Sequence, residues 1–219
     1  MQERLDGARP AISITAMPIF QNAGKLLYFA HVPKCAGTSI ENYLTRRFGP
    51  AALLDRRFVP GRQRNWTSTS PQHVPAAQLE RLFPEGFFDA GFAFVRDPLA
   101  RATSAFHFHQ SNRGKIDADL SLADWIRRIP GFKPDMHDRY DGHFRSQSHI
   151  VPQWCRVFRL EDGFDEFIAW LDAWSASTHG AGMAHTLAGR YEAGSLDKVT
   201  LGLFHNLYRD DYDRFGYDI

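Results

Sequence analysis

Short apolar runs alternate with segments of helical periodicity along the 219-residue chain. Residues 25–31, 87–95 and 154–160 are apolar runs of strand length, which is typical of buried strands in a parallel sheet. Helical patterns lie at 38–48, 76–83, 98–110, 121–129, 164–174 and 196–215. Strands that alternate with helices predict a mixed α/β fold with a central parallel sheet flanked by helices.

The remaining segments predict the domain organisation. Residues 1–24 are interrupted by prolines and are expected to form an irregular N-terminal arm, followed by a single domain over 25–219. Residues 130–152 are polar and carry scattered histidines (His137, His143, His149), and residues 175–195 are rich in Gly, Ala and His. Loops of this length are usually functional or mobile, so the second is a candidate lid.

Composition narrows the class of protein. A hydrophobic content of 43% fits a globular chain, and a net charge of +1 gives no global field for binding nucleic acid. No apolar run approaches the roughly 20 residues that cross a bilayer. Charged residues also interrupt the first 15 positions, so we expect a soluble, cytoplasmic protein. Cys35 and Cys155 are too few for a disulfide framework and are expected to be free thiols.

The stretch LLYFAHVPKCAGTS, residues 26–39, carries the strongest signal for binding. An apolar strand ends at Pro33, and a loop of small residues then opens onto a helix. Backbone N–H groups and the positive end of the helix dipole converge at such a point. Lys34 adds a charge, and Thr38 and Ser39 add hydroxyl donors. The stretch therefore predicts a site for phosphate or sulfate.

This loop differs from the common nucleotide phosphate loop, in which Lys directly precedes a Ser or Thr that holds magnesium. Here Lys34 stands three residues before Gly37. The order H-V-P-K-C-A-G-T-S resembles instead the 5′-phosphosulfate loop of sulfotransferases that use 3′-phosphoadenosine 5′-phosphosulfate (PAPS). It looks like the loop of the carbohydrate branch that includes heparan sulfate 2-O-sulfotransferase, in which Thr often stands at the position of Cys35.

The resemblance implies a three-layer, P-loop-like sulfotransferase fold and a bacterial-type soluble member, since animal relatives are anchored in the Golgi membrane. It implies that the loop binds the cofactor through Lys34, Cys35, Ala36, Gly37, Thr38 and Ser39. Cys35 stands near a helix N-terminus and a lysine, where a thiolate is favoured. We nevertheless expect this residue to act through its backbone N–H.

A second motif, R-D-P-L-A-R-A-T-S, follows the second apolar run. Asp97 is a plausible N-cap, and Pro98 suits the first helical position. In sulfotransferases the similar pattern R-D-P-x-x-R-x-x-S binds the 3′-phosphate of PAPS, which implies that role for Arg96 and Ser104. Arg101, between them, is expected to pair with a carboxylate and to position the helix.

Lys34 is also predicted to be catalytic. In sulfuryl transfer a hydroxyl attacks sulfur, charge builds on the departing 5′-phosphate, and an ammonium group stabilises that charge. The sulfuryl group carries less charge than a phosphoryl group, and the sequence has no convincing carboxylate cluster for magnesium. We therefore expect no metal cofactor.

Histidine is the natural candidate for the general base, because its usual pKa is near 6.5. His73, in S-P-Q-H-V-P, resembles the family's H-x-P or H-x-H stretch and is the predicted base; the alternative is a structural histidine that caps the next helix. His31 is expected to support the loop. His107 and His109 lie on different helix faces and make a poor metal pair. Arg145 and Gln147, in H-F-R-S-Q, are weaker candidates near the cofactor.

The acceptor is less constrained. Residues 46–64 contain six arginines and one aspartate, and form either a solvated face or a wall of a groove for an anionic sugar. The prediction is a PAPS-dependent sulfotransferase acting on a hydroxyl of a carbohydrate or glycan. Two alternatives remain: a small-molecule kinase of P-loop ancestry, and a non-catalytic module that binds 3′-phosphoadenosine 5′-phosphate (PAP) or sulfated glycans.

Overall fold

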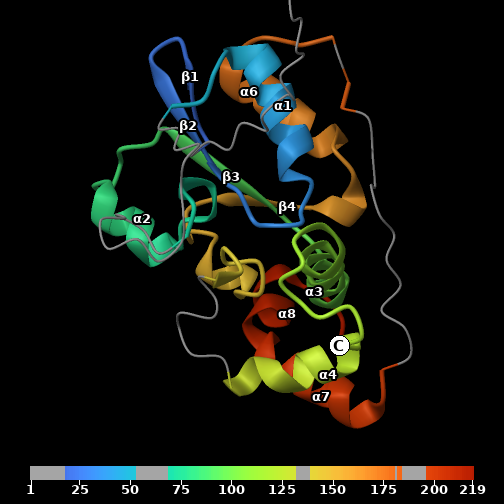
Figure 1. Ribbon diagram of the computed structural model, residues 1–219. Coiled ribbons are helices and arrows are strands. Elements are labelled where there is room, and N and C mark those ends of the chain that lie inside the picture. The colour runs from blue at the N-terminus through green and yellow to red at the C-terminus, as the bar shows by residue number, and fades with distance from the viewer. Residues whose placement is uncertain (1–17, 53–68, 132–138, 181, 184–195) are drawn as a thin grey trace, which may run out of the picture.

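The computed structural model describes residues 18–52, 69–131, 139–180, 182–183 and 196–219 (Figure 1). Its sheet has the strand order β1-β2-β3-β4. The strands are β1 (Ile19–Asn22), β2 (Lys25–Ala30), β3 (Ala90–Val95) and β4 (Arg156–Arg159). β1 runs antiparallel to β2, whereas β2, β3 and β4 are parallel to one another. The predicted mixed α/β architecture with a mostly parallel sheet is confirmed.

Helices follow the strands along the chain. The α-helices are α1 (Gly37–Phe48), α2 (Ala76–Leu82), α3 (Pro98–His107), α4 (Leu122–Arg128), α6 (Asp165–Ser175), α7 (Lys198–Leu207) and α8 (Arg209–Phe215). The shorter turns are η1 (Pro71–His73), η2 (Phe108–Asn112), η3 (Ile129–Gly131), η4 (Gln147–His149) and η5 (Leu160–Asp162). Within the described ranges, no helix is long and apolar enough to span a bilayer.

The expectation of an irregular segment up to residue 24 is wrong for Ile19–Asn22, which pairs with β2 as a hairpin. The turn consists of Ala23 and Gly24, with φ values of 49° and 83°. Positive φ at both central residues is the conformation of a tight hairpin turn whose twist matches the strands. Residues 1–17 of the predicted arm lie outside the described part of the chain.

Two helical predictions also need correction. The helix expected over 98–110 is α-helical only to His107 and continues as a π-helical turn, η2. The final stretch expected over 196–215 is two helices, α7 and α8, which meet at Tyr208. The Tyr208 hydroxyl donates to the carbonyl of Phe144 at 2.8 Å, so a tertiary contact holds the chain where the helix breaks.

Aromatic side chains form the core on one face of the sheet. Phe29 of β2 stacks on Phe92 of β3, with ring centroids 4.8 Å apart. Phe167 of α6 lies 4.7 Å from Phe92 and 5.2 Å from Phe94. Tyr43 of α1 touches the same Phe167 ring, so α1 and α6 cover this face together (Figure 1).

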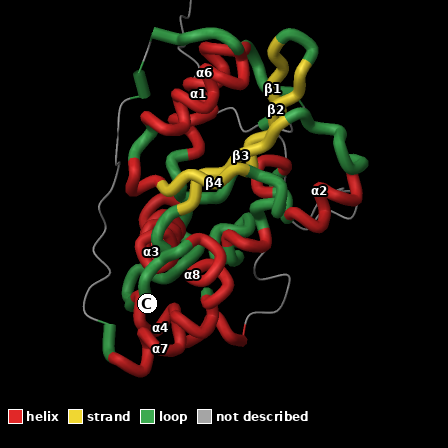
Figure 2. Tube along the Cα trace, turned by 180° about the vertical axis from the view of Figure 1, so that it is seen from behind, coloured by secondary structure: helices red, strands yellow, loops and turns green. Residues whose placement is uncertain are grey.

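The carboxyl ends of the parallel strands point toward the other helices. Figure 2, from behind, shows α3, α4, α7 and α8 gathered beyond one end of the sheet. Because β2, β3 and β4 are parallel, the segments that leave them meet at this end. In open α/β sheets, ligands bind at the carboxyl ends of the strands. The two sequence motifs follow β2 and β3, so the fold brings them to the same edge.

Candidate active site

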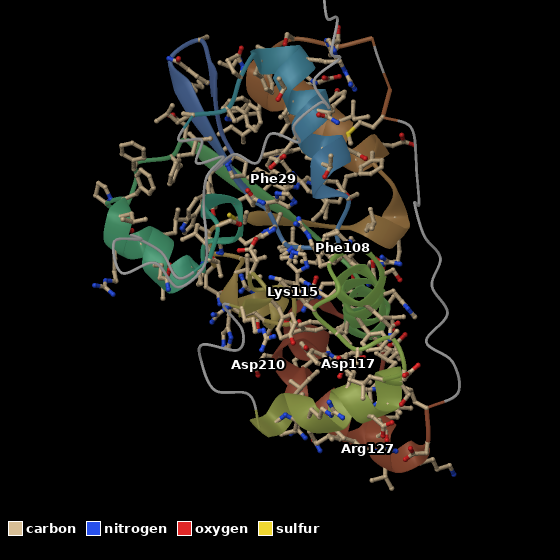
Figure 3. The ribbon with its side chains drawn as sticks, in the orientation of Figure 1. Phe29, Phe108, Lys115, Asp117, Arg127 and Asp210 are labelled. Carbon is tan, nitrogen blue, oxygen red and sulfur yellow. The ribbon has the colours of Figure 1, made fainter. Side chains whose placement is uncertain are left out.

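The site lies where the chain leaves β2 and β3; Figure 3 labels Phe29 of β2 and Phe108 of η2, whose rings contact residues of the site. Phe29 stacks against His31 at 5.2 Å, and the Lys34 Nζ lies 4.1 Å from the centroid of the Phe108 ring. The segment after β4 joins the same edge, since Glu161 Oε1 accepts a 2.8 Å hydrogen bond from the backbone N–H of Asp97.

The loop before α1 presents unpaired backbone donors. Lys34 and Ala36 have φ values of 70° and 58°, in the left-handed region. The backbone N–H groups of residues 34–38 make no hydrogen bond with any described residue, and no side chain caps the N-terminus of α1. Successive N–H groups in such a conformation form a concave site for an anion, and the helix dipole adds to it. We call residues 34–39 the cofactor loop.

His31 packs against this loop at Gly37. A Cβ atom on Gly37 would lie 1.5 Å from Nε2 of His31, so only glycine fits there. His31 Nδ1 lies 2.9 Å from Glu41 Oε1 on α1, which fixes the ring. The expected supporting role of His31 therefore agrees with its contacts.

Lys34 supplies a cation to the mouth of the loop. Burial lowers the pKa of this half-buried lysine, and the nearby positive charge of Arg96 lowers the pKa further. Its ammonium makes no hydrogen bond or ion pair with a described residue; its one such contact is with the Phe108 ring. Two neighbouring cations without a carboxylate between them form a site that an anion would stabilise.

Arg96 and Ser104 occupy the positions that the second motif predicted. Asp97 caps α3 by accepting a 2.7 Å hydrogen bond from the N–H of Ala100, as the sequence indicated. Gln147 fixes the backbone of Arg96: its Oε1 accepts from the Arg96 N–H at 3.0 Å, and its Nε2 donates to the Arg96 carbonyl at 2.8 Å. The guanidinium of Arg96 has no partner among the described residues. Ser104 is buried on α3.

Cys35 is not a thiolate. Its side chain is 1% exposed, and burial raises its pKa to about 12. The Sγ atom lies 3.6 Å from Gln147 Oε1 and 3.7 Å from the Pro33 carbonyl. Burial outweighs the helix N-terminus and nearby cations that favour the charged form. Cys35 and Cys155 are both free thiols, as predicted.

A buried carboxylate that the sequence analysis did not single out fixes the segment 146–148 beside the site. Asp211 of α8 accepts hydrogen bonds from the backbone N–H groups of Gln147 at 2.9 Å and Ser148 at 2.8 Å, and from the hydroxyl of Ser146. Asp211 and Gln147 are fully buried. Gln147, a weak candidate from the sequence, thus connects Asp211 to both the cofactor loop and Arg96.

The prediction that Arg101 pairs with a carboxylate is wrong. Its hydrogen bonds go to two backbone carbonyls, from Nη1 to His143 at 3.0 Å and from Nη2 to Arg145 at 2.6 Å. The side chain is fully buried. Arg101 therefore holds the 143–145 segment against α3.

His73 lies in η1, close to the end of β2. Its Nδ1 is 2.9 Å from the carbonyl oxygen of His31. A carbonyl only accepts, so Nδ1 carries the proton and Nε2 carries the lone pair. Burial lowers the pKa of His73 to about 4, although Asp141, whose Oδ2 is 4.0 Å from Nε2, raises it. At neutral pH the ring is an uncharged imidazole with a proton-accepting atom.

Two further buried histidines, His143 and His109, form a series of contacts with His73. The His143 ring lies 5.4 Å from that of His73, and its Nδ1 is 3.0 Å from Nε2 of His109. Burial lowers the pKa of both His143 and His109. His109 thus contacts His143, on a segment 34 residues away, and sequence spacing gave no indication of this pairing.

Some predicted features lie outside the described residues. These are Arg56 and Arg57 of the arginine-rich segment, His137, and most of the candidate lid. Of the arginines described there, Arg47 forms an ion pair with Asp172 of α6 at 2.7 Å, and Arg46 is exposed. Arg47 thus has a structural role.

Fold and site together define a mixed α/β protein with a loop of unpaired backbone donors at the carboxyl edge of its sheet. The family model described as "Sulfotransferase family" matches residues 18–218, so the chain belongs to the sulfotransferase family. Neither the curated proteins nor the solved structures include a significant match.

Proposed function

We propose that the protein transfers a sulfuryl group from PAPS to a hydroxyl of a carbohydrate or glycan, giving PAP and a sulfate ester. Membership of the sulfotransferase family supports sulfuryl transfer in general. The observation that carries the choice of donor is the run of unpaired N–H groups at residues 34–38, with the unpaired cations Lys34 and Arg96 beside it. A donor with phosphates at both its 5′ and 3′ positions has anionic groups for both the loop with Lys34 and the guanidinium of Arg96.

The two sequence motifs supply the proposed contacts. The cofactor loop holds the 5′-phosphosulfate through its N–H groups and the hydroxyls of Thr38 and Ser39. Arg96 and Ser104 hold the 3′-phosphate, for which a guanidinium is a suitable bidentate donor. In this proposal the domain has the three-layer, P-loop-like sulfotransferase architecture and acts in the cytoplasm.

PAPS supplies the sulfuryl group, and the chain supplies charge stabilisation and a base. The acceptor oxygen forms a bond to sulfur while the bond from sulfur to the bridging oxygen breaks. Lys34 stabilises the charge that develops on that oxygen as the electron pair leaves with PAP. His73 Nε2 accepts the proton of the attacking hydroxyl. No metal has a role in this proposed reaction.

The resemblance of H-V-P-K-C-A-G-T-S to the heparan sulfate 2-O-sulfotransferase branch supports a carbohydrate acceptor. Incubation of the full chain with radiolabelled PAPS and glycans from the source cell, without magnesium, would test this. We expect release of PAP and radiolabel on a glycan. In a parallel assay with ATP, turnover that requires magnesium would favour the kinase alternative. Binding of PAP without transfer of the label would favour the binding module.

The proposed base has its own test. His73→Ala should retain PAP affinity and lower transfer by about 10²–10⁴-fold, the usual contribution of a general base. The matched control is His149→Ala, because His149 is exposed. If His73→Ala transfers at the parent rate, the base is elsewhere, and His143 is the next candidate.

A further inference from the structure

His73, Asp141 and His143 converge near the carboxyl edge of the sheet. Each offers one possible ligand atom, and these atoms all lie within 4.8 Å of one another. We call these three residues the histidine–aspartate cluster. Both histidines are buried, and Asp141 is half-buried. The donor set of two imidazoles and one carboxylate goes beyond what the proposed transfer reaction uses.

Each member of the cluster has a partner that fixes its orientation. His73 Nδ1 lies 2.9 Å from the His31 carbonyl, which directs Nε2 toward Asp141. The Asp141 carboxylate accepts from the N–H and the hydroxyl of Ser70, at 2.7 and 2.8 Å. His143 Nδ1 lies 3.0 Å from His109 Nε2, and this contact fixes the His143 ring. Outer partners of this kind orient the ligands of natural metal sites.

We propose that the histidine–aspartate cluster binds a divalent transition metal of the zinc type. Imidazole nitrogen and carboxylate oxygen are the ligands that Zn²⁺ and its neighbours accept, and three protein ligands leave a position for water. Bonds of about 2.0–2.1 Å place tetrahedral ligands about 3.3 Å apart, so these side chains must close by less than about 1 Å each.

Electrostatics make Asp141 the decisive ligand. Lys34 and Arg101 lie close enough to His143 that their positive charges lower its pKa, and they also oppose a bound dication. Asp141 provides the negative charge within the cluster.

The consequence for activity rests on the proposed function. A metal on His73 Nε2 occupies the lone pair that accepts the proton of the acceptor hydroxyl. The bound ion therefore inhibits transfer and leaves the cofactor loop free. Zinc should lower the transfer rate without lowering PAP affinity.

The test uses the untagged full chain, freed of metal by a chelator that is then removed. Calorimetric titration with Zn²⁺ should show saturable binding at a single site, and Co²⁺ should give the visible absorption of a low-coordinate site. Asp141→Asn and His143→Gln should each weaken binding by more than the roughly 10–100-fold typical of losing an outer partner. Ser70→Ala, which removes part of such a partner, should fall in or below that range. His149→Gln is the control and should bind as the parent does.

Two results would overturn the proposal. One is a parent protein with no saturable zinc binding at micromolar concentration; the other is binding that survives unchanged in both Asp141→Asn and His143→Gln. A circular dichroism spectrum and a thermal unfolding transition of each variant show that it is folded. The zinc titration contains no nucleotide, so its outcome is independent of whether PAPS is the donor. Zinc that binds without slowing transfer would overturn the inhibitory role alone.

Discussion

Two polar regions near the carboxyl edge of the sheet differ in how their groups are satisfied. In the cofactor loop, the backbone N–H groups of residues 34–38 and the Lys34 ammonium have no hydrogen-bond partner among the described residues. The same holds for the guanidinium of Arg96 beside the loop. At Asp211, which Gln147 links to the Arg96 backbone, the buried carboxylate receives hydrogen bonds from the segment 146–148.

The presence or absence of hydrogen-bond partners distinguishes polar groups with a structural role from polar groups that are candidates for binding a ligand. Buried polar groups are nearly always hydrogen-bonded, and an unsatisfied one needs a specific explanation. Asp211 and Gln147 satisfy each other and their neighbours, so they stabilise the fold. The backbone N–H groups of the cofactor loop have no such partner among the described residues, and in our proposal the 5′-phosphosulfate of PAPS accepts from them. Gln147 joins the two regions, because it holds the Arg96 backbone and lies against Cys35.

The largest effect is expected at Asp211. Asp211→Ala leaves the buried N–H groups of Gln147 and Ser148 without their acceptor, at about 1–3 kcal/mol each. The free energy of unfolding in urea should therefore fall by about 2–6 kcal/mol. Asp210→Ala is the matched control, since Asp210 is exposed on the same helix. A variant as stable as this control would mean that the network does not stabilise the fold.

Lys34→Ala should give the opposite pattern. Stability should hold, because the removed ammonium is partly desolvated and has no ion pair in the described structure. Transfer should fall by about 10²–10³-fold, about 2.7–4 kcal/mol in the barrier, with a smaller loss of PAP affinity. Lys198→Ala, at an exposed position of α7, is the control. Near-parent turnover of Lys34→Ala would remove this lysine from the mechanism.

Within the cofactor loop, Cys35 combines a buried side chain with an unpaired backbone N–H. Its thiol is protonated and buried, and its backbone N–H makes no hydrogen bond with a described residue. Cys35→Thr should therefore still bind PAP and transfer, with stability lowered by about 1–3 kcal/mol because a methyl group enters a packed site. Cys35→Ser controls for the added volume. A folded, PAP-binding Cys35→Thr protein without activity would make the thiol essential.

The smallest effect is expected at the surface, where a paired carboxylate caps α7. Asp197 accepts from the Thr200 N–H at 2.9 Å, and this hydrogen bond lowers its pKa to about 2. A lowered folded-state pKa contributes stability above the unfolded value of about 3.9 and loses it as pH falls toward 2. The melting temperatures of the parent and Asp197→Asn should therefore converge between about pH 4 and pH 2. A constant difference across that range would exclude this cap as the cause.

The sequence predicted the parts of the site that are local. The strand, loop and helix that carry Lys34 are contiguous, and so are the strand and capped helix that carry Arg96. The β1 hairpin was missed although Ala23-Gly24 stands between two apolar runs, because the run before the turn is short. The π-helical turn after α3 and the break at Tyr208 have no glycine or proline to mark them.

The rest depends on contacts that only the fold creates. Asp211 lies 64 residues from Gln147, and Asp141 lies 71 residues from Ser70. Neither pair has a spacing signal. The sequence also could not show that burial would outweigh the local charges at Cys35, or that Arg101 would find carbonyls where a carboxylate was expected.

The central claim is that the open donors of the site belong to PAPS, and the 3′-phosphate tests it most directly. PAP and adenosine 5′-phosphate differ only by that group. Charge-assisted hydrogen bonds contribute about 1.5–3 kcal/mol each. Calorimetric titration without magnesium should therefore give PAP a dissociation constant at least about 10–100-fold lower than that of adenosine 5′-phosphate. The Arg96→Ala, Ser104→Ala double variant should lose most of this preference and keep weak binding at the cofactor loop. Equal affinity of the parent for the two nucleotides would contradict the account.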